Sequence, residues 1–379
     1  MFLDPSPRPL ALALAITLGL AACDRQPSTP VTADSDARVS ASESADVADL
    51  VTVAEAFSTV MTPEDNIDSL ASWRAGDGAV WVLATAKSTD KLVVYDGQTG
   101  ETLRSFGVRG DGPGQFKRPN GIVIADDLAF VIERDNRRVQ VLRLPSFEPL
   151  LSFGTDELVK PYGGWVDKTD GGYALYVTDS YTGGTDGLDK DIAPPLTELD
   201  RRVRHYRVTV DGTTANATLV GTYGDTSELG ALRVVESLWG DAANNRLLIA
   251  EEDEEYANEV KVYDLEGNFT GQVIGKETFQ AQAEGLSLKT CGDGSGWWIG
   301  TQQGKDHSVF HLFERQSFAH VGSFRGAKVA NTDGIWLDPQ ASERFPEGAL
   351  YAVHDDQGAV AFDWRALATA LSLPKCAAE

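Results

Sequence analysis

The chain has few cysteines, few histidines and an unbalanced set of charges. Its 379 residues include only three Cys, five His and two Met, and 57 Asp and Glu stand against 33 Lys and Arg. With so few imidazoles, a binuclear zinc or iron centre is not expected. The formal net charge of −24 would repel nucleic acid and anionic lipid, so neither is expected as the main partner. The excess of carboxylates suits divalent cations, although solubility alone would also account for it.

Two of the three cysteines, Cys291 and Cys376, lie in the C-terminal part of the chain. Neither resembles a catalytic thiol, because no Arg follows Cys291 at the spacing of a phosphatase loop and no His is its neighbour. In an oxidising compartment a disulfide between them would pin the C-terminus to the body of the protein, and two free thiols are the alternative. The Arg204-His-Tyr-Arg207 segment lacks the Gly and Pro of a histidine acid phosphatase loop.

Long apolar runs are missing apart from Leu10–Leu20, which is short for a transmembrane helix. Arg8 precedes this run and Leu20-Ala21-Ala22-Cys23 follows it, which resembles a bacterial lipobox. Residues 1–23 are therefore expected to be a lipoprotein signal peptide, and an ordinary signal peptide with an incidental Cys is the alternative. The lipid on Cys23 would be the protein's only membrane contact, anchoring it in the cell envelope of a bacterium and facing the periplasm or the exterior. Residues 24–50, rich in Ser, Ala and Asp, are expected to form a flexible tether.

From residue 51 to 379 the sequence repeats one plan of short strands and turns. An apolar or aromatic residue followed by Gly closes each unit. Successive closures are about 45–50 residues apart, and in one case about 70, which is typical of propeller blades. The predicted fold is an all-β, six-bladed β-propeller with four-stranded antiparallel blades. The Val51–Ser58 run could close the ring by pairing with the last blade, Asp179–Asp200 is expected to be a surface insertion, and Trp364–Leu373 a short helix. The blades are expected near residues 80–106, 121–154, 163–224, 236–275, 284–326 and 333–363.

Two stretches of the chain carry further signals. The Gly110–Phe116 turn together with Asn136-Arg137 resembles an NHL repeat, which supports a propeller but says little about activity. The Glu236–Asp253 stretch is a predicted hairpin with an acid at its start and three consecutive acids at its end. By strand alternation Glu236 and Glu252 are expected to face the channel and Glu251 to face outward.

The C-terminal half of the chain contains acidic motifs in a fixed order. They are Glu236-Ser-Leu, Leu248–Asp253, Ala283-Glu-Gly-Leu, Gln303-Gly304, Phe313-Glu-Arg, Asn331–Ile335 and Leu350–Asp355. In order and rough spacing they resemble the β-propeller phytases, the calcium-dependent phosphatases of phytate. The first half matches more thinly, at Asp68–Trp73, Lys87, Asn136-Arg137 and Tyr162-Gly163.

The resemblance implies a calcium site at one mouth of the channel. The metal ligands it implies are Asp68, Glu236, Glu284, Asp333 and Asp355. Ca²⁺ takes six to eight oxygen ligands, which carboxylates from several strands can supply. The resemblance places Glu252 beside substrate and metal, and Lys87, Arg137 and Tyr162 on the phosphate, with Arg138 as the register alternative to Arg137. Each of these side chains could instead be a solvated strand end.

The activity implied is 3-phytase-type release of phosphate from phytate or a related phosphorylated small molecule, by a metal-bound water, in a monomeric enzyme. Ser69, Ser88 and Gln282 stand where the family has a carboxylate, a cation and an acid, and His354 where it has Gln. These departures motivate a second hypothesis, a non-catalytic NHL-like propeller that binds a ligand or a protein partner outside the cytoplasm.

Overall fold

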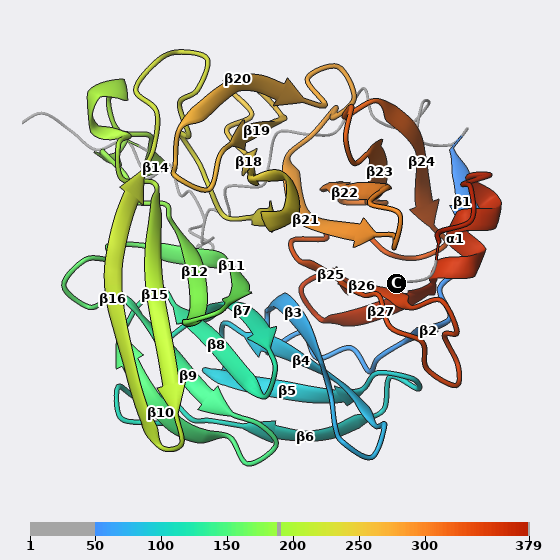
Figure 1. Cartoon of the computed structure of the whole chain (residues 1–379), viewed down its shortest axis with the longest axis horizontal. Coiled ribbons are helices and arrows are strands. Elements are labelled where there is room, and N and C mark those ends of the chain that lie inside the picture. The colour runs from blue at the N-terminus through green and yellow to red at the C-terminus, as the bar shows by residue number, and fades with distance from the viewer. Residues whose placement is uncertain (1–49, 188–190, 378–379) are drawn as a thin grey trace, which may run out of the picture. The chain divides into compact units, whose positions relative to one another are not determined.

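Short apolar strands separated by turn residues form six four-stranded antiparallel sheets in the computed structural model, which describes residues 50–187 and 191–377. The sheets surround one axis as the blades of a six-bladed β-propeller, so the predicted fold is confirmed (Figure 1). The expected blade limits lie close to the observed sheets. The predicted signal peptide, the predicted lipid on Cys23 and the predicted tether, except for residue 50, lie outside the described residues.

Each blade runs outward from an innermost strand that lines the channel. In the first three blades the strands in order are β3 (Ile67–Arg74), β4 (Val80–Ala86), β5 (Lys91–Asp96), β6 (Thr102–Phe106); β7 (Pro119–Ala125), β8 (Leu128–Glu133), β9 (Arg138–Arg143), β10 (Glu148–Phe153); β11 (Pro161–Thr169), β12 (Gly172–Asp179), β15 (Val203–Asp211), β16 (Thr214–Tyr223). In the last three they are β17 (Leu238–Asp241), β18 (Arg246–Glu251), β19 (Glu259–Tyr263), β20 (Phe269–Ile274); β21 (Ala283–Thr290), β22 (Gly296–Gln302), β23 (Val309–Glu314), β24 (His320–Gly326); β25 (Ile335–Asp338), β26 (Ala349–His354), β27 (Gly358–Asp363) and β2 (Phe57–Ser58). A 3₁₀ turn, η3 (Ala242–Asn244), joins β17 to β18.

Burial along the strands follows their place in the blade. All residues of β8 and β22 are buried, because a neighbouring blade covers each face of a middle strand. The outermost β6 is almost wholly exposed. Continuous apolar runs are typical of strands covered on both faces, and they supply the core between the blades.

The ring closes through the N-terminal residues, as the sequence predicts, but in two places. Phe57–Ser58 pairs with β27 and supplies the outermost strand of the last blade. Strand β1 (Val51–Val53) instead runs parallel to β24 and extends the fifth blade. Pairing with both blades removes exposed sheet edges where the chain would otherwise open.

The C-terminal helix α1 (Trp364–Ala370) follows the last strand, and a disulfide joins Cys291 to Cys376 beyond it. The disulfide alternative is therefore the one observed, with Cα atoms 5.2 Å apart and a sequence separation of 85 residues. We expect Cys376→Ser to lower the free energy of unfolding by about 2–4 kcal/mol, since closing a long loop constrains the unfolded chain. Urea unfolding of the variant beside the oxidised and reduced parent measures this, and equal stabilities would contradict it.

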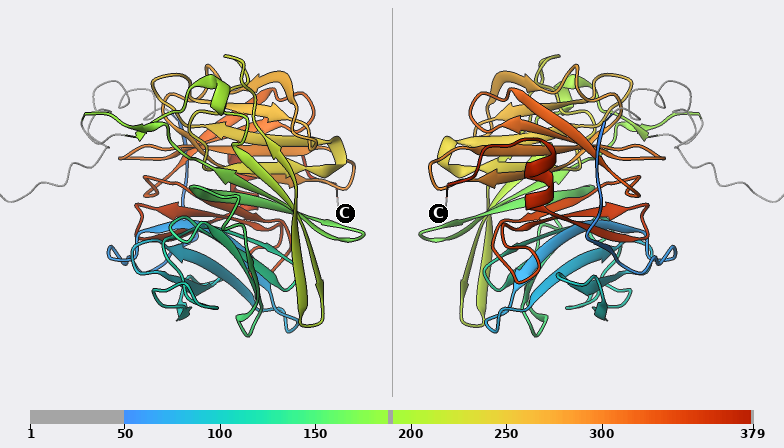
Figure 2. Two further views of the ribbon diagram at one scale, coloured as in Figure 1. Left: turned by 90° about the vertical axis from the view of Figure 1, so that its left-hand side faces the viewer. Right: turned by 90° about the vertical axis from the view of Figure 1, so that its right-hand side faces the viewer.

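The stretch between β12 and β15 is an insertion, as predicted, and projects beyond the blades along the channel axis (Figure 2). Its described part contains β13 (Gly184–Thr185), β14 (Asp191–Ile192) and η2 (Leu196–Glu198). Lys160 Nζ lies 2.5 Å from Asp191 Oδ2, which ties the insertion to the start of the third blade. No helix among the described residues is long and apolar enough to cross a membrane.

Candidate metal centre

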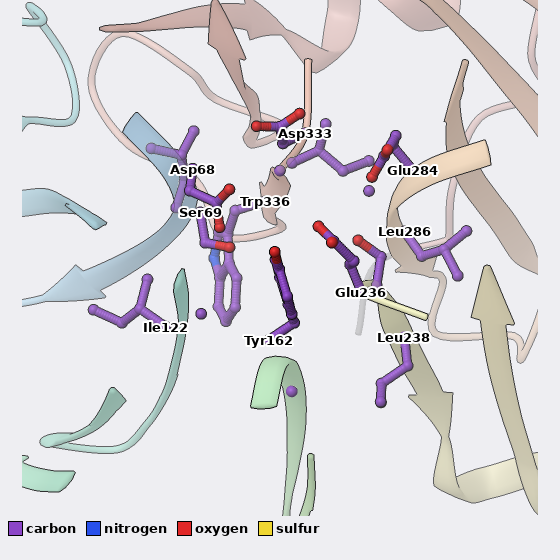
Figure 3. Close-up of a pocket in the computed structure, with 18 of the residues that line it drawn as sticks. Asp68, Ser69, Ile122, Tyr162, Glu236, Leu238, Glu284, Leu286, Asp333 and Trp336 are labelled. Atoms are coloured by element: carbon purple, nitrogen blue, oxygen red, sulfur yellow. The ribbon is translucent and has the colours of Figure 1, made fainter. Parts of the chain in front are cut away.

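The first strand of every blade enters the channel with the same two-residue pattern, a polar residue followed by Gly or Ser. The six pairs are Asp68-Ser69, Asn120-Gly121, Tyr162-Gly163, Glu236-Ser237, Glu284-Gly285 and Asp333-Gly334. In β3, β7, β11 and β21 the pairing register shifts at this point. Such bulges re-aim a side chain locally. Four carboxylates and one tyrosine therefore come together at one mouth of the channel (Figure 3).

The small second residue of the pair lets neighbouring blades approach closely. A Cβ added to Gly163 would lie 2.2 Å from the carbonyl oxygen of Glu236, and one added to Gly334 would lie 2.6 Å from that of Asp68. Each of these contacts reaches the polar residue of the next blade. Close packing of the backbone therefore explains why a small residue follows the polar residue, and the chemistry at the mouth explains the polar residue itself.

Three glutamates converge more closely than the rest. Carboxylate oxygens of Glu236, Glu252 and Glu284 lie within 4.8 Å of one another, and Glu252 and Glu284 are buried. Glu252 follows β18 directly, and its Oε1 accepts hydrogen bonds from the backbone N–H groups of Glu236 at 3.1 Å and Ser237 at 3.3 Å. These contacts fix one oxygen of Glu252 relative to Glu236.

A lysine separates the two aspartates on the other side of the mouth. Lys87 Nζ lies 2.5 Å from Asp68 Oδ1 and 3.6 Å from Asp333 Oδ2. Gln303 Nε2 donates a hydrogen bond to Asp333. The predicted residues Asp68, Lys87 and Asp333 therefore lie together, with the lysine as an internal counter-charge.

The carboxylates repel one another in a site that excludes water. Burial and then the charge of Asp68 raise the pKa of Glu236 to about 7. Burial raises the pKa of Glu252 and Glu284 well above the usual value, and neighbouring carboxylates raise it further. Burial alone would lower the pKa of Lys87, but Asp68, Asp333 and Glu236 raise it above its usual value. The mouth is therefore short of positive charge.

A second set of equivalent positions follows the second strand of each blade. They are Lys87, Arg134, Ser180, Glu252, Gln303 and Asp355. In the first five blades, the backbone N–H of this residue donates a hydrogen bond to a backbone carbonyl group near the start of the first strand. That carbonyl group belongs to the residue two positions before the polar residue of the first strand. Comparing the blades in this way points to Arg134, which the sequence analysis missed.

Arg134 rather than Arg137 reaches the mouth. Burial raises the pKa of Tyr162 and the charge of Arg134 acts to lower it, and Arg134 Nε donates to Asp135 Oδ1 at 2.7 Å. Arg137 is exposed in the turn that precedes β9. The backbone at Arg137 has a φ of 52°, the left-handed conformation of a turn. Lys160, also missed, lies with Nζ 5.8 Å from the centre of the Tyr162 ring and lowers the pKa of Glu236. The structure therefore brings Arg134, three residues before Arg137, to the mouth, and the phosphate contact of Arg137 stays a prediction.

Two acidic positions also differ from expectation. Asp355 is exposed and accepts a hydrogen bond from Gln357 at 2.8 Å. Asp355 and Asp356 both adopt positive φ, and it is Asp356 that interacts with Lys87 and Asp333. Glu251 does not face solvent: it is fully buried and accepts backbone N–H bonds from Arg233 at 2.6 Å and Val234 at 3.1 Å.

Arg138 has a structural position. It is buried, with Nε 2.6 Å from Glu133 Oε1, and donates to the carbonyl groups of Asp111 and Gln115 in the NHL-like turn.

Arg138→Met is expected to lower the free energy of unfolding by about 3 kcal/mol, because Glu133 is left as an unpaired buried charge. Chemical denaturation tests this, and a variant as stable as the parent would contradict it.

The donor set fits a calcium ion. All of its side-chain donors are hard carboxylate oxygens, supplied by the first, fourth, fifth and sixth blades. Ca²⁺ prefers such oxygens, and a bound cation would offset the repulsion that raises the pKa values of the glutamates. Asn120 occupies the equivalent place in the second blade, is fully buried, and its amide oxygen and nitrogen have no hydrogen-bond partner among the described residues. The narrow channel behind the ring has a volume of about 50 Å³, which is room for ions or a few waters but not for an organic substrate.

No protein-family model and no curated protein matches the chain. Among solved structures it is similar to hydrazine synthase of Kuenenia stuttgartiensis, with 13% identity and a TM-score of 0.43, over 77% of this chain and 75% of that one. It is also similar to the nidogen/laminin complex, with 11% identity and a TM-score of 0.43, over 70% of this chain and 82% of that one.

Proposed function

We propose that the channel mouth holds calcium and hydrolyses a phosphomonoester, with phytate as the first substrate to test. The observation that carries the proposal is the convergence of Glu236, Glu252 and Glu284 within 4.8 Å in a buried site. Glu236, Glu252 and Glu284 would hold the ion, and Asp68 and Asp333 flank it. Bound calcium would supply Lewis-acid charge at the phosphate.

The chain's own cations suit a phosphate bound outside the narrow channel. Lys87, Arg134 and Lys160 come from two sides of the mouth, and Tyr162 between them carries one donor hydroxyl. Arg134 and the lysines would bind phosphate oxygens and orient the ester. Glu252, whose Oε1 is fixed by the backbone N–H groups of Glu236 and Ser237, would hold the ion and orient the attacking water, and the proton of that water would pass to solvent at the open mouth.

Phosphate release from phytate by the purified protein, with calcium and with a chelator, tests the proposal. Calcium-stimulated release supports it, and no release from phytate or from any other phosphomonoester would refute it. In that case the alternative is a non-catalytic propeller that binds a ligand or a protein partner.

The two arginines near the second blade provide a matched pair of variants. Arg134→Gln is expected to raise KM about tenfold, the effect of one lost charged hydrogen bond, while Arg137→Gln leaves KM unchanged because its side chain is exposed in the turn before β9. Initial-rate kinetics measure both. The reverse order of effects would return the phosphate contact to Arg137.

A further inference from the structure

A second cavity lies at the far end of the channel, where the innermost strands end. Its volume is about 440 Å³, against about 50 Å³ for the narrow part behind the carboxylates. Pockets for small organic ligands have volumes of roughly 300–1,000 Å³. The far cavity therefore has room for an organic molecule, and the narrow part has not.

Tryptophans from four blades line this cavity. They are Trp73 of β3, Trp165 of β11, Trp239 of β17 and Trp336 of β25. The rings of Trp239 and Trp336 have centres 5.2 Å apart and planes at 75°, so they meet as two walls of a corner. Both also line the narrow channel and divide it from the far cavity; Figure 3 shows Trp336 behind the carboxylates.

The indoles are held in place by protein contacts. Trp73 Nε1 donates to Asp127 Oδ1 at 2.9 Å, and Trp336 Nε1 donates to Ser72 Oγ at 2.9 Å. Trp165 packs against Tyr176 with ring centres 5.4 Å apart. A ligand that enters the cavity therefore meets fixed aromatic faces, which lowers the entropic cost of binding.

The charge at the rim is negative. Asp338 is paired with Arg74 at 2.8 Å and Asp126 with Lys168 at 2.7 Å. Asp127 is exposed and forms no ion pair within the part of the chain that the structure describes. Aromatic faces are electron-rich and attract ammonium groups. Asp127, whose side chain accepts the hydrogen bond from Trp73, lies beside them as a counter-charge.

We infer that the far cavity binds an organic cation with a methylated ammonium head group. Trp239 and Trp336 form the aromatic walls and Asp127 supplies the counter-charge. This site is separate from the proposed hydrolytic mouth and does not depend on calcium.

Choline is the probe, and dimethylbutanol, which replaces its charged nitrogen by carbon, is the neutral control. Calorimetric titration of the full chain in a chelator should show choline binding about tenfold or more tighter than the alcohol, the share that cation–π attraction adds. Equal affinities, or no choline binding, would overturn the inference. Because calcium is absent, the result is independent of whether the mouth hydrolyses phosphoesters.

Variants locate the site. Asp127→Asn, at an exposed position, should weaken choline binding about tenfold, and Trp239→Leu should abolish it. Trp297→Phe, which removes an indole that packs on Trp364 away from the cavity, should leave binding unchanged. Thermal unfolding of each variant checks that it is folded. Choline affinity unaffected by both Asp127→Asn and Trp239→Leu would overturn the assignment.

Discussion

Replacing Glu284 by Gln is expected to lower calcium-dependent phosphate release by about a hundredfold or more while the propeller stays folded. Glu284 is buried and shares the mouth with Glu236 and Glu252 within 4.8 Å. The amide keeps the size of the side chain but removes its negative charge. It also leaves only one of the two carboxylate oxygens that can bind a calcium ion.

The matched control is Glu277→Gln, an exposed residue between the fourth and fifth blades. It changes the net charge by the same amount and is expected to have the parent's activity. Phosphate release, measured with circular dichroism on each variant, decides the outcome. Full activity in Glu284→Gln would remove this residue from the site.

Without calcium, the protein is expected to lose stability as pH rises through about 7. Burial raises the pKa of Glu236 to about 7 from 4.5, so the folded state binds a proton that the unfolded state has already lost. A raised pKa contributes stability that is complete below the unfolded value and disappears as pH rises through the folded value. The loss is of order 3 kcal/mol for a shift of this size.

Calcium should reverse this loss. A ligand at a hundredfold excess over its Kd stabilises the folded state by about 2.7 kcal/mol, which corresponds to roughly 5 °C in Tm for a domain of this size. Thermal unfolding at about pH 5 and about pH 8, with calcium and with a chelator, measures both effects. A Tm that rises with pH in the chelator, or one indifferent to calcium, would contradict the account.

The blades were predictable because their closing residues recur at a regular distance, and because some middle strands contain apolar runs such as Leu128–Ile132. The Glu236, Glu284 and Asp333 positions were predicted from motifs that resemble a known family, and the fold supplies a physical reason for them. Each stands at the start of an innermost strand and is followed by Gly or Ser. A local sequence pattern therefore specifies both the strand and the direction of its first polar side chain.

The remaining errors come from turns, where register is not fixed by periodicity. Asp355 and Asp356 both adopt positive φ. In this turn Asp356 interacts with Lys87 and Asp333, where Asp355 was expected to do so. Alternation predicts that Glu251 and Glu252 point in different directions, but it does not reveal that Glu251 is buried and accepts hydrogen bonds from the backbone N–H groups of Arg233 and Val234. The four tryptophans of the far cavity are distant in sequence, and each reads singly as an ordinary core residue.

Calorimetric titration of calcium into the metal-free protein measures whether the channel mouth binds calcium. The parent should bind calcium, Glu236→Gln and Glu252→Gln should each weaken that binding by about a hundredfold, and Asp355→Asn should bind as the parent does because its side chain is exposed. Absence of calcium binding by the parent, or glutamate variants that bind calcium as tightly as the parent, would contradict the assignment of this mouth as a calcium site.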